Sequence, residues 1–295
     1  MRASQLEELM HLDQQAAVKH QSTAPCDSFA GNLLATPLAW NLVADAYTAE
    51  LVPQFEPFAR DALRLAELPP QAHVADVAAG PGTLALLAAT GGAAVSAVDF
   101  SAAMIGHLRQ RAAEAGLVAI DAQVGDGQAL PLASDAYDGA FSMFGLMMFP
   151  DREAGFRELR RVLRPGRRAV VSSWAPVQEP FLTVMESLGA MLPNLPFGRD
   201  GGPLSNPNEF SGEMAAVGFR DVQIHLVSHR LFAPSIAGLW ASLQRTMAPI
   251  VLLRHRLGDE QWAQMAPQIF ARLRARLGDG PVDSSVTAYL GVGTK

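Results

Sequence analysis

The chain of 295 residues is 49% hydrophobic and 18% charged, which is enough to build a globular core in one large domain or two. Its formal net charge of -6 argues against a partner with a phosphate backbone, and its single cysteine excludes an internal disulfide and a cysteine metal cluster. No apolar run has the length of a membrane span, and the first residues lack the core of a signal peptide. These features predict a soluble protein of the cytoplasm.

The N-terminal part of the sequence has little regular pattern. We interpret residues 1–40 as an N-terminal arm, with one short helix over about 5–18. Residues 40–68 have helical periodicity, which we expect to break at Pro53. The remainder, residues 41–295, is predicted to form one domain.

Strand and helix patterns alternate from residue 73 onward, which is typical of a parallel sheet with helices on both faces. The predicted strands are apolar over most of their length, as expected of strands buried on both sides. We expect strands at 73–78, 93–99, 119–126, 137–144 and 168–174, with helices at about 82–90, 102–115 and 152–163.

The alternation ends after residue 174. The sequence then predicts a helix at about 181–192, a loop at 193–210, a strand at 219–232, helices around 235–252 and 259–277, and a last strand at 284–295. The last two helices form an insertion at about 234–282. We interpret it as a cap over a ligand cavity or as a dimer surface, because it is rich in apolar residues.

One basic segment, "RELRRVLRPGRR" at residues 157–168, stands out against the acidic composition. Its positive charges favour the solvated face of a helix over a nucleic-acid patch, because the rest of the chain offers no basic field.

The stretch "VADVAAGPGTLALLAATGGAAVSAVDFS", residues 74–101, has the outline of a nucleotide-type site: a strand, a glycine turn, a helix and a second strand. Gly80, Gly82 and Ala85 fit the dinucleotide pattern G-x-G-x-x-A. The same outline fits proteins that bind S-adenosylmethionine. The two ligands differ in charge, since one carries a pyrophosphate and the other a sulfonium.

Three carboxylates bear on that choice. Asp76 lies near the end of the first strand, Asp99 ends the second and Asp126 ends the third. Ligands bind outside the carboxyl ends of such strands, so we expect the three acids to face one crevice. A carboxylate close to a pyrophosphate costs about 1 to 4 kcal/mol, whereas a sulfonium and an ammonium are attracted. Asp76, together with Pro81, which lacks an N–H for a phosphate, favours the cation.

With these motifs, the sequence resembles a class I S-adenosylmethionine-dependent methyltransferase, closest to the ubiquinone/menaquinone-biosynthesis type. The resemblance covers about residues 40–174 and rests on "VADVAAGPGTLA", "AVDFSAAMI", "VGDGQALPLASDAYDGAFSMFGLMMFPD" and "FRELRRVLRPGRR". It implies a Rossmann-like α/β fold with a seven-stranded sheet in the order 3-2-1-4-5-7-6, in which strand 7 is antiparallel. Two departures are Ala78, where many members have glycine, and Arg167, in place of the second glycine of "RPGG".

The resemblance also implies a binding site for S-adenosylmethionine, with S-adenosylhomocysteine as the product. Asp99 matches the acid that binds the ribose, and Tyr47 resembles a residue that closes over the cofactor. The residues expected to bind the cofactor are Tyr47, Asp76, Ala78, Gly80, Gly82, Asp99, Phe100, Met104, Asp126, Gly127 and Met143.

The acceptor is expected beyond the fourth and fifth strands. Phe144, Met147, Met148 and Trp174 cluster there and predict an apolar pocket that suits an aromatic acceptor. Four histidines are expected away from the acceptor side, and the other three, His11, His20 and His255, cannot be placed. Nothing has the spacing of metal ligands, so no catalytic side chain is assigned.

Three functions remain open. The first is methyl transfer by in-line displacement to the oxygen or carbon of a small, largely apolar acceptor, which could be quinone-like or phenol-like. The second is a nicotinamide-dependent oxidoreductase, which Asp76 disfavours. The third is a protein that binds S-adenosylmethionine but no longer transfers methyl. The predicted partner is a small molecule rather than a nucleic acid, and a homodimer is possible.

Overall fold

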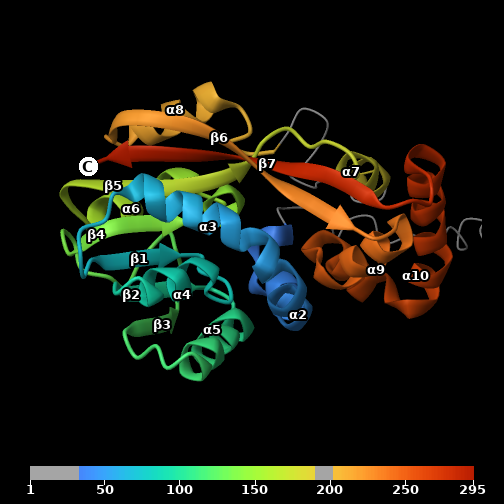
Figure 1. The fold of residues 1–295 in the computed structure, drawn as a ribbon, viewed down its shortest axis with the longest axis horizontal. Coiled ribbons are helices and arrows are strands. Elements are labelled where there is room, and N and C mark those ends of the chain that lie inside the picture. Colours follow the sequence, from blue (N-terminus) through green and yellow to red (C-terminus); the bar gives the residue numbers. More distant parts are fainter. Residues whose placement is uncertain (1–32, 190–201) are drawn as a thin grey trace, which may run out of the picture. The chain divides into compact units, whose positions relative to one another are not determined.

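The computed structural model describes residues 33–189 and 202–295, which belong to the compact unit Asn32–Lys295. The helix expected at residues 5–18 lies outside the described residues. A single seven-stranded sheet has the order β3-β2-β1-β4-β5-β7-β6, with β7 antiparallel to both neighbours (Figure 1). The expected order is therefore confirmed. The strands are β1 (His73–Val77), β2 (Ala94–Asp99), β3 (Ile120–Val124), β4 (Tyr137–Ser142), β5 (Leu163–Trp174), β6 (Arg220–Ala233) and β7 (Val282–Thr294).

The parallel half of the sheet forms because its strands are short apolar runs. Every residue of β4 is buried, and four of the five residues of β1 are buried. Strands of this kind require cover on both faces. Helices α4 (Thr83–Thr90), α5 (Ala102–Glu114) and α6 (Arg152–Val162) follow β1, β2 and β4 and supply part of that cover (Figure 1).

The helical segment before the sheet differs from its prediction. Helix α2 (Pro37–Ala46) continues through a π-helical turn, η4 (Tyr47–Leu51), into α3 (Val52–Ala66). The chain stays helical at Pro53, which lies in the first turn of α3 directly after the π turn, so the expected break is a change of helix type rather than an end. The irregularity is the π turn, and π turns are frequent at functional sites.

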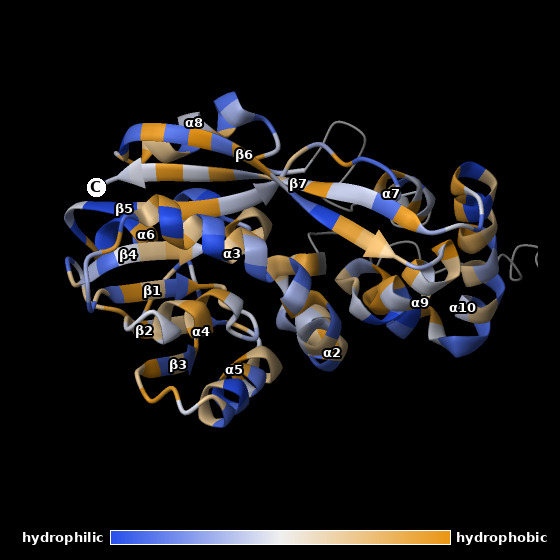
Figure 2. Cartoon of the chain, in the orientation of Figure 1, coloured by the Kyte–Doolittle hydropathy of each residue, from blue (hydrophilic) through white to orange (hydrophobic). Residues whose placement is uncertain are grey.

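The last two strands form a long antiparallel ribbon, paired from Arg220 and Thr294 to Ala233 and Val282. Side chains on β6 alternate between exposed and partly buried positions, and hydropathy alternates with them (Figure 2). The ribbon continues beyond the parallel strands and carries α9 (Ile236–Thr246) and α10 (Ala248–Leu277) (Figure 1). Gly258 interrupts α10 with a φ of 77°.

The loop expected at 193–210 is wrong at its C-terminal end. After α7 (Phe181–Gly189), the structure has a helix α8 (Pro207–Ala216). Asn206 caps it, because its side-chain oxygen accepts the Asn208 N–H at 2.9 Å, and Pro207 occupies the first turn. Asn and Pro are typical of turns, but here the same residues begin a helix.

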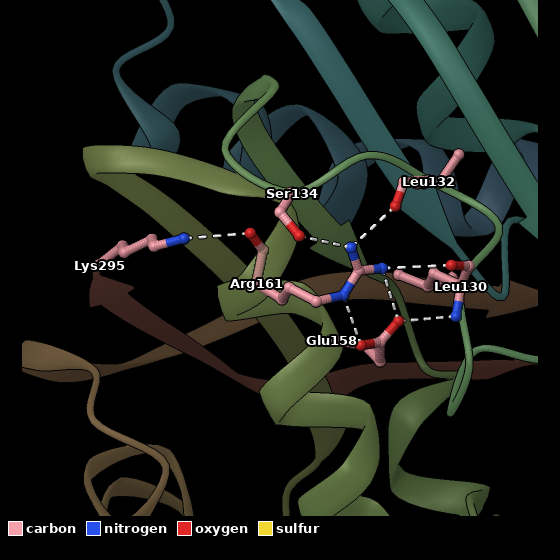
Figure 3. A network of polar contacts seen from close by, with 6 residues as sticks. All are labelled: Leu130, Leu132, Ser134, Glu158, Arg161 and Lys295. Atoms are coloured by element: carbon pink, nitrogen blue, oxygen red, sulfur yellow. Dashed lines mark hydrogen bonds and ion pairs between the residues drawn. The ribbon is translucent and has the colours of Figure 1, made fainter.

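The basic segment 157–168 is used inside the fold. Arg161 donates to the carbonyl oxygens of Leu130 and Leu132, to Ser134 and to Glu158, and so fastens α6 to the connection between β3 and β4 (Figure 3). Further ion pairs join Arg164 and Arg167 to Asp138 and Arg168 to Glu67. These charges hold neighbouring elements together, which agrees with a structural rather than a nucleic-acid interpretation.

Candidate functional site

A cavity of about 320 Å³ lies at the carboxyl ends of the parallel strands. Residues after β1 to β5, on η4 and α3, and on α9 line it, and a smaller cavity of about 40 Å³ shares part of its wall. The expected site residues that line one or both cavities are Tyr47, Asp76, Ala78, Gly80, Asp99, Phe100, Met104, Asp126, Gly127, Met143, Phe144, Met148 and Trp174. Together the two cavities have an acidic end, where Asp99 lines the larger and Asp76 the smaller cavity, and an apolar end between Trp174 and α9.

The glycine turn shapes the floor of the acidic end. Gly80 and Gly82 have φ values of 54° and 82°, and Ala78 has a φ of 56°, in the region that favours glycine. Gly145 lies opposite Ala78, and a Cβ on Gly145 would be 2.2 Å from the Ala78 methyl group. The loss of glycine at position 78 is therefore accommodated by a glycine across the turn.

Gly82 does not line either cavity, although its neighbours Pro81 and Thr83 line the smaller one, so its expected place among the binding residues stays a prediction. It is the N-cap of α4, and a Cβ there would be 2.6 Å from the Leu108 side chain. Its lack of a side chain lets α4 pack closely against α5, so it also acts on the site through the turn.

Asp99 ends β2 and is held by two backbone donors. The Gly80 N–H donates to one carboxylate oxygen and the Ser101 N–H to the other, each at 2.8 Å. Burial raises the pKa of Asp99 to about 6, although both hydrogen bonds act in the opposite direction. Each oxygen retains a lone pair for a ligand, because an ionised carboxylate accepts about four hydrogen bonds.

Asp76 is more deeply buried, with 1% of its surface exposed, and lines the smaller cavity beside Tyr47 and Phe144. Its Oδ2 atom accepts no hydrogen bond from any residue in the described part of the chain. Burial raises the pKa of Asp76 to about 7, opposed by the Ala85 N–H and supported by the nearby charge of Asp99. A buried carboxylate oxygen without a donor is costly unless a ligand completes it, and a cation bearing N–H groups would do so.

Asp126 differs from the other two acids. It lies two residues beyond the end of β3 and is exposed, and its Oδ1 accepts the Gln128 N–H at 2.8 Å. The adjacent Gly127 is required by packing, because a Cβ there would be 2.4 Å from the Phe149 ring. The three acids thus lie at the same edge of the sheet, as expected, but only Asp76 and Asp99 are buried.

Aromatic rings separate the two ends of the cavity. Phe144 and Trp174 stack with ring centroids 3.8 Å apart and an interplanar angle of 16°, and Phe55 contacts both. Phe144 has a φ of 59°, which is uncommon for a bulky residue, and its N–H donates to the buried Ser172 hydroxyl at 2.8 Å. Tyr47 extends the group toward Asp99, whose charge, after burial, raises the pKa of the phenol.

Met148 lines the apolar end, but Met147 does not, which corrects the expected pocket. Both lie in the short helix η5 (Leu146–Met148), where adjacent side chains point in different directions. Met147 is 1% exposed and belongs to the hydrophobic core beneath the cavity.

The wall opposite the sheet was missed by sequence reasoning. Trp40, Leu51, Gln54 and Phe55 line the cavity with Tyr47, and their spacing of about seven and then four residues marks one helical face. That periodicity could have identified these residues as part of the cavity wall. The lining residues of α9 had no such sequence signal, because the inward face of an insertion depends on tertiary packing.

Helix α9 is attached to η4 by a polar contact. The Glu50 carboxylate accepts the Ser242 hydroxyl at 2.5 Å and two N–H groups of Arg245 at 2.8 and 3.1 Å. These hydrogen bonds and the attraction of Arg245 hold the pKa of Glu50 below its usual value. One turn of helix thus places Tyr47 at the acidic end and holds α9 over the apolar end.

Comparison with known families agrees with this arrangement. Residues 74–166 match the family described as a methyltransferase domain, and this range contains the glycine turn and all three acids. Residues 74–166 are thus similar to a methyltransferase domain. Outside this range, β7 and β6 extend the same sheet, and α2, η4, α3 and α9 supply further residues to the cavity wall.

Relatives of the methyltransferase domain include enzymes of quinone biosynthesis. The chain is 40% identical over 116 residues to a demethylmenaquinone methyltransferase of Corynebacterium kroppenstedtii, covering 39% of this chain and 48% of that protein. It is 28% identical over 185 residues to the ubiquinone/menaquinone biosynthesis C-methyltransferase of Geotalea daltonii, covering 56% and 78%. The chain spans 38 to 48% of the length of several curated relatives that it matches.

A solved structure shows the same fold. The crystal structure of a Bacillus halodurans C-125 protein described as a methyltransferase superposes with a TM-score of 0.56 at 14% identity, covering 80% of this chain and 98% of that one.

Among the described helices, none alone is long and apolar enough to cross a membrane. The pair α9 and α10 has the length and composition of a membrane span only when both helices are counted together, and the two are bent by 71°.

Proposed function

We propose that the protein transfers a methyl group from S-adenosylmethionine to a small, largely apolar acceptor. The observation that carries the proposal is the Asp76 carboxylate, which is buried beside Asp99 with one oxygen lacking a donor. Asp99 suits the ribose of either ligand, but a carboxylate at Asp76 disfavours an anionic dinucleotide. A ligand with an ammonium group would neutralise Asp76.

The residues present fit this cofactor. Asp76 would accept from the ammonium group, and Asp99 would accept from ribose hydroxyls with the lone pairs that Gly80 and Ser101 leave available. The apolar Phe100 and Met104 line the same part of the cavity and offer a surface for the adenine. Tyr47 lines both cavities and would shield this region from water.

Bound S-adenosylmethionine supplies a methyl group that is already activated by its sulfonium. The task of the chain is therefore to orient the acceptor, exclude water and stabilise the positive charge until it is lost. The faces of Tyr47, Phe55 and Phe144, which line both cavities, carry negative potential and suit a cation. Among the described residues that line the cavity there is no histidine or lysine to act as a base.

The acceptor class is supported by the lining of the apolar end. Phe144, Met148 and Trp174 are joined there by Met185 and Leu243, which favour a flat or aromatic hydrophobic molecule. The quinone-biosynthesis enzymes among the relatives are consistent with a quinone-like or phenol-like acceptor. The absence of a nucleic-acid partner, a homodimer and a cytoplasmic location stay predictions.

Calorimetry on the purified protein tests the proposal. We expect binding of S-adenosylmethionine and S-adenosylhomocysteine and no binding of NAD. Incubation with S-adenosylmethionine and a panel of phenols and quinols, followed by mass spectrometry, should then show a gain of one methyl group. Binding of NAD in place of S-adenosylmethionine would overturn the proposal, whereas cofactor binding without methylation of any acceptor would favour a protein that only binds the cofactor.

A further inference from the structure

The face that α9 turns toward the apolar end contains two hydroxyl groups. Leu239, Ser242, Leu243 and Thr246 all line the cavity, and their spacing of three and four residues places them on one side of the helix. Two polar groups in an otherwise apolar wall are candidates for the contacts that fix the orientation of a ligand.

The hydrogen atoms of both hydroxyls are already engaged. Ser242 donates to Glu50 at 2.5 Å, and Thr246 donates to the carbonyl oxygen of Ser242 at 2.9 Å. Glu50 cannot donate in return, because its two bonds from Arg245 stabilise the ionised carboxylate. A hydroxyl with its hydrogen fixed in this way offers only lone pairs in other directions.

The carboxylate at the apolar end is less available to a ligand. The Oε2 atom of Glu179 accepts the Thr183 hydroxyl at 2.8 Å, and its Oε1 atom forms an ion pair with Arg276 at 2.6 Å. Glu179 therefore links α7 to the end of α10. Its Oε1 atom accepts no hydrogen bond from the described residues, but Arg276 balances its charge, so a ligand there would compete with that ion pair. Ser242 has no such competing cation on its own oxygen and is the better placed polar group for an acceptor.

Resting on the methyl transfer proposed above, we propose that Ser242 selects an acceptor that carries an O–H or N–H donor on an apolar body. The donor binds the Ser242 oxygen, whose hydrogen remains on Glu50. Thr246 is 2% exposed and contributes less. A molecule without a donor leaves the serine lone pairs unpaired in a dry wall, and an anionic group meets the Glu50 carboxylate behind them.

A matched pair of ligands tests this selection. Protein saturated with S-adenosylhomocysteine, which cannot methylate, is titrated calorimetrically with 2-naphthol and with 2-methoxynaphthalene. One hydrogen bond predicts that the wild type binds 2-naphthol about three- to tenfold more tightly. In Ser242→Ala the preference should fall below about twofold. Changing the ligand and the side chain separately and together forms a thermodynamic cycle, which isolates the contact between the ligand hydroxyl and Ser242.

Ser211→Ala is the control, because Ser211 is also on a helix with its hydroxyl hydrogen engaged, here by the Asn208 carbonyl oxygen, but it does not line the cavity. It should keep the wild-type preference. Equal binding of the two compounds by the wild type would overturn the inference, as would an unchanged preference in Ser242→Ala or a failure of both compounds to bind. Failure to bind S-adenosylhomocysteine in the first step would instead contradict the proposed function.

Discussion

The acidic end and the apolar end of the cavity affect the fold in opposite ways. At the acidic end, Asp76 and Asp99 are buried carboxylates whose pKa values are raised, so their ionised forms disfavour the folded state. At the apolar end, Phe144 and Trp174 stack and cover each other, so the same contacts that form the pocket stabilise the protein. The residues that bind a charged ligand therefore destabilise the empty protein, whereas the residues that bind an apolar ligand stabilise it.

The largest expected effect is the stabilisation of the empty protein by Asp76→Asn. Burial places the pKa of Asp76 at about 7 in the fold, above its ordinary value of 3.8. The protonated form therefore favours folding, and this contribution is lost as the pH rises from about 4 through 7. At pH 8 the variant should be more stable by about 2 to 4 kcal/mol.

Chemical denaturation of both proteins at pH 8 and pH 4 measures this effect. The difference between them should shrink to less than about 1 kcal/mol at pH 4, where Asp76 is protonated in the folded state and about half protonated in the unfolded state. The same variant should bind S-adenosylmethionine about tenfold more weakly, because one charge is lost. A variant that is less stable than the wild type at pH 8 would mean that Asp76 is already satisfied in the empty protein.

The apolar end should give the opposite sign. Trp174→Ala removes a ring that stacks on Phe144 and contacts Phe55, and we expect a loss of about 2 to 3 kcal/mol of stability, because the side chain is only half-buried. Binding of S-adenosylhomocysteine should change less than about threefold, since Trp174 does not line the smaller cavity beside Asp76. Thermal unfolding and calorimetry test both parts. A large loss of cofactor affinity with little loss of stability would contradict the division into two ends.

We expect the loss of S-adenosylmethionine affinity to be larger when a buried acid is removed than when an exposed acid is removed. Asp99→Ala removes a carboxylate that is 6% exposed, and it should weaken S-adenosylmethionine binding by about one to two orders of magnitude. Asp126→Ala is the matched comparison at an exposed position, where water screens the charge, so we expect less than about a threefold change. Titration of the two variants under the same conditions measures the contrast. Equal losses would place Asp126 in the binding site on the same footing as Asp99.

The acidic end could be predicted from the sequence because each acid follows a short apolar run that fixes where a strand ends. Asp76 and Asp99 lie where those runs place them, and the sheet order follows from the family resemblance. The apolar end could be predicted only in part. Met147 and Met148 are adjacent and alike, and the geometry of a three-residue helix decides which one reaches the cavity.

The contacts of the insertion could not be predicted. Glu50 and Ser242 are 192 residues apart, and neither belongs to a motif. Their contact exists because the ribbon of β6 and β7 returns α9 to the π turn at η4, and a π turn has no clear sequence signature. Asn206 and Pro207 show the same limit locally, since residues typical of a loop can equally cap a helix.

The most direct test of the acidic end is the number of protons released when S-adenosylmethionine binds. The pKa values of Asp76 and Asp99, about 7 and 6 in the empty protein, leave both carboxylates partly protonated near pH 6.5. A cation favours their ionised forms, so binding should release protons, and the affinity should rise as the pH increases toward 8. Calorimetry at pH 6.5 in buffers of different ionisation enthalpy counts these protons, and Asp76→Asn should release fewer. Proton uptake, or no proton exchange in the wild type, would contradict a site built for a cation.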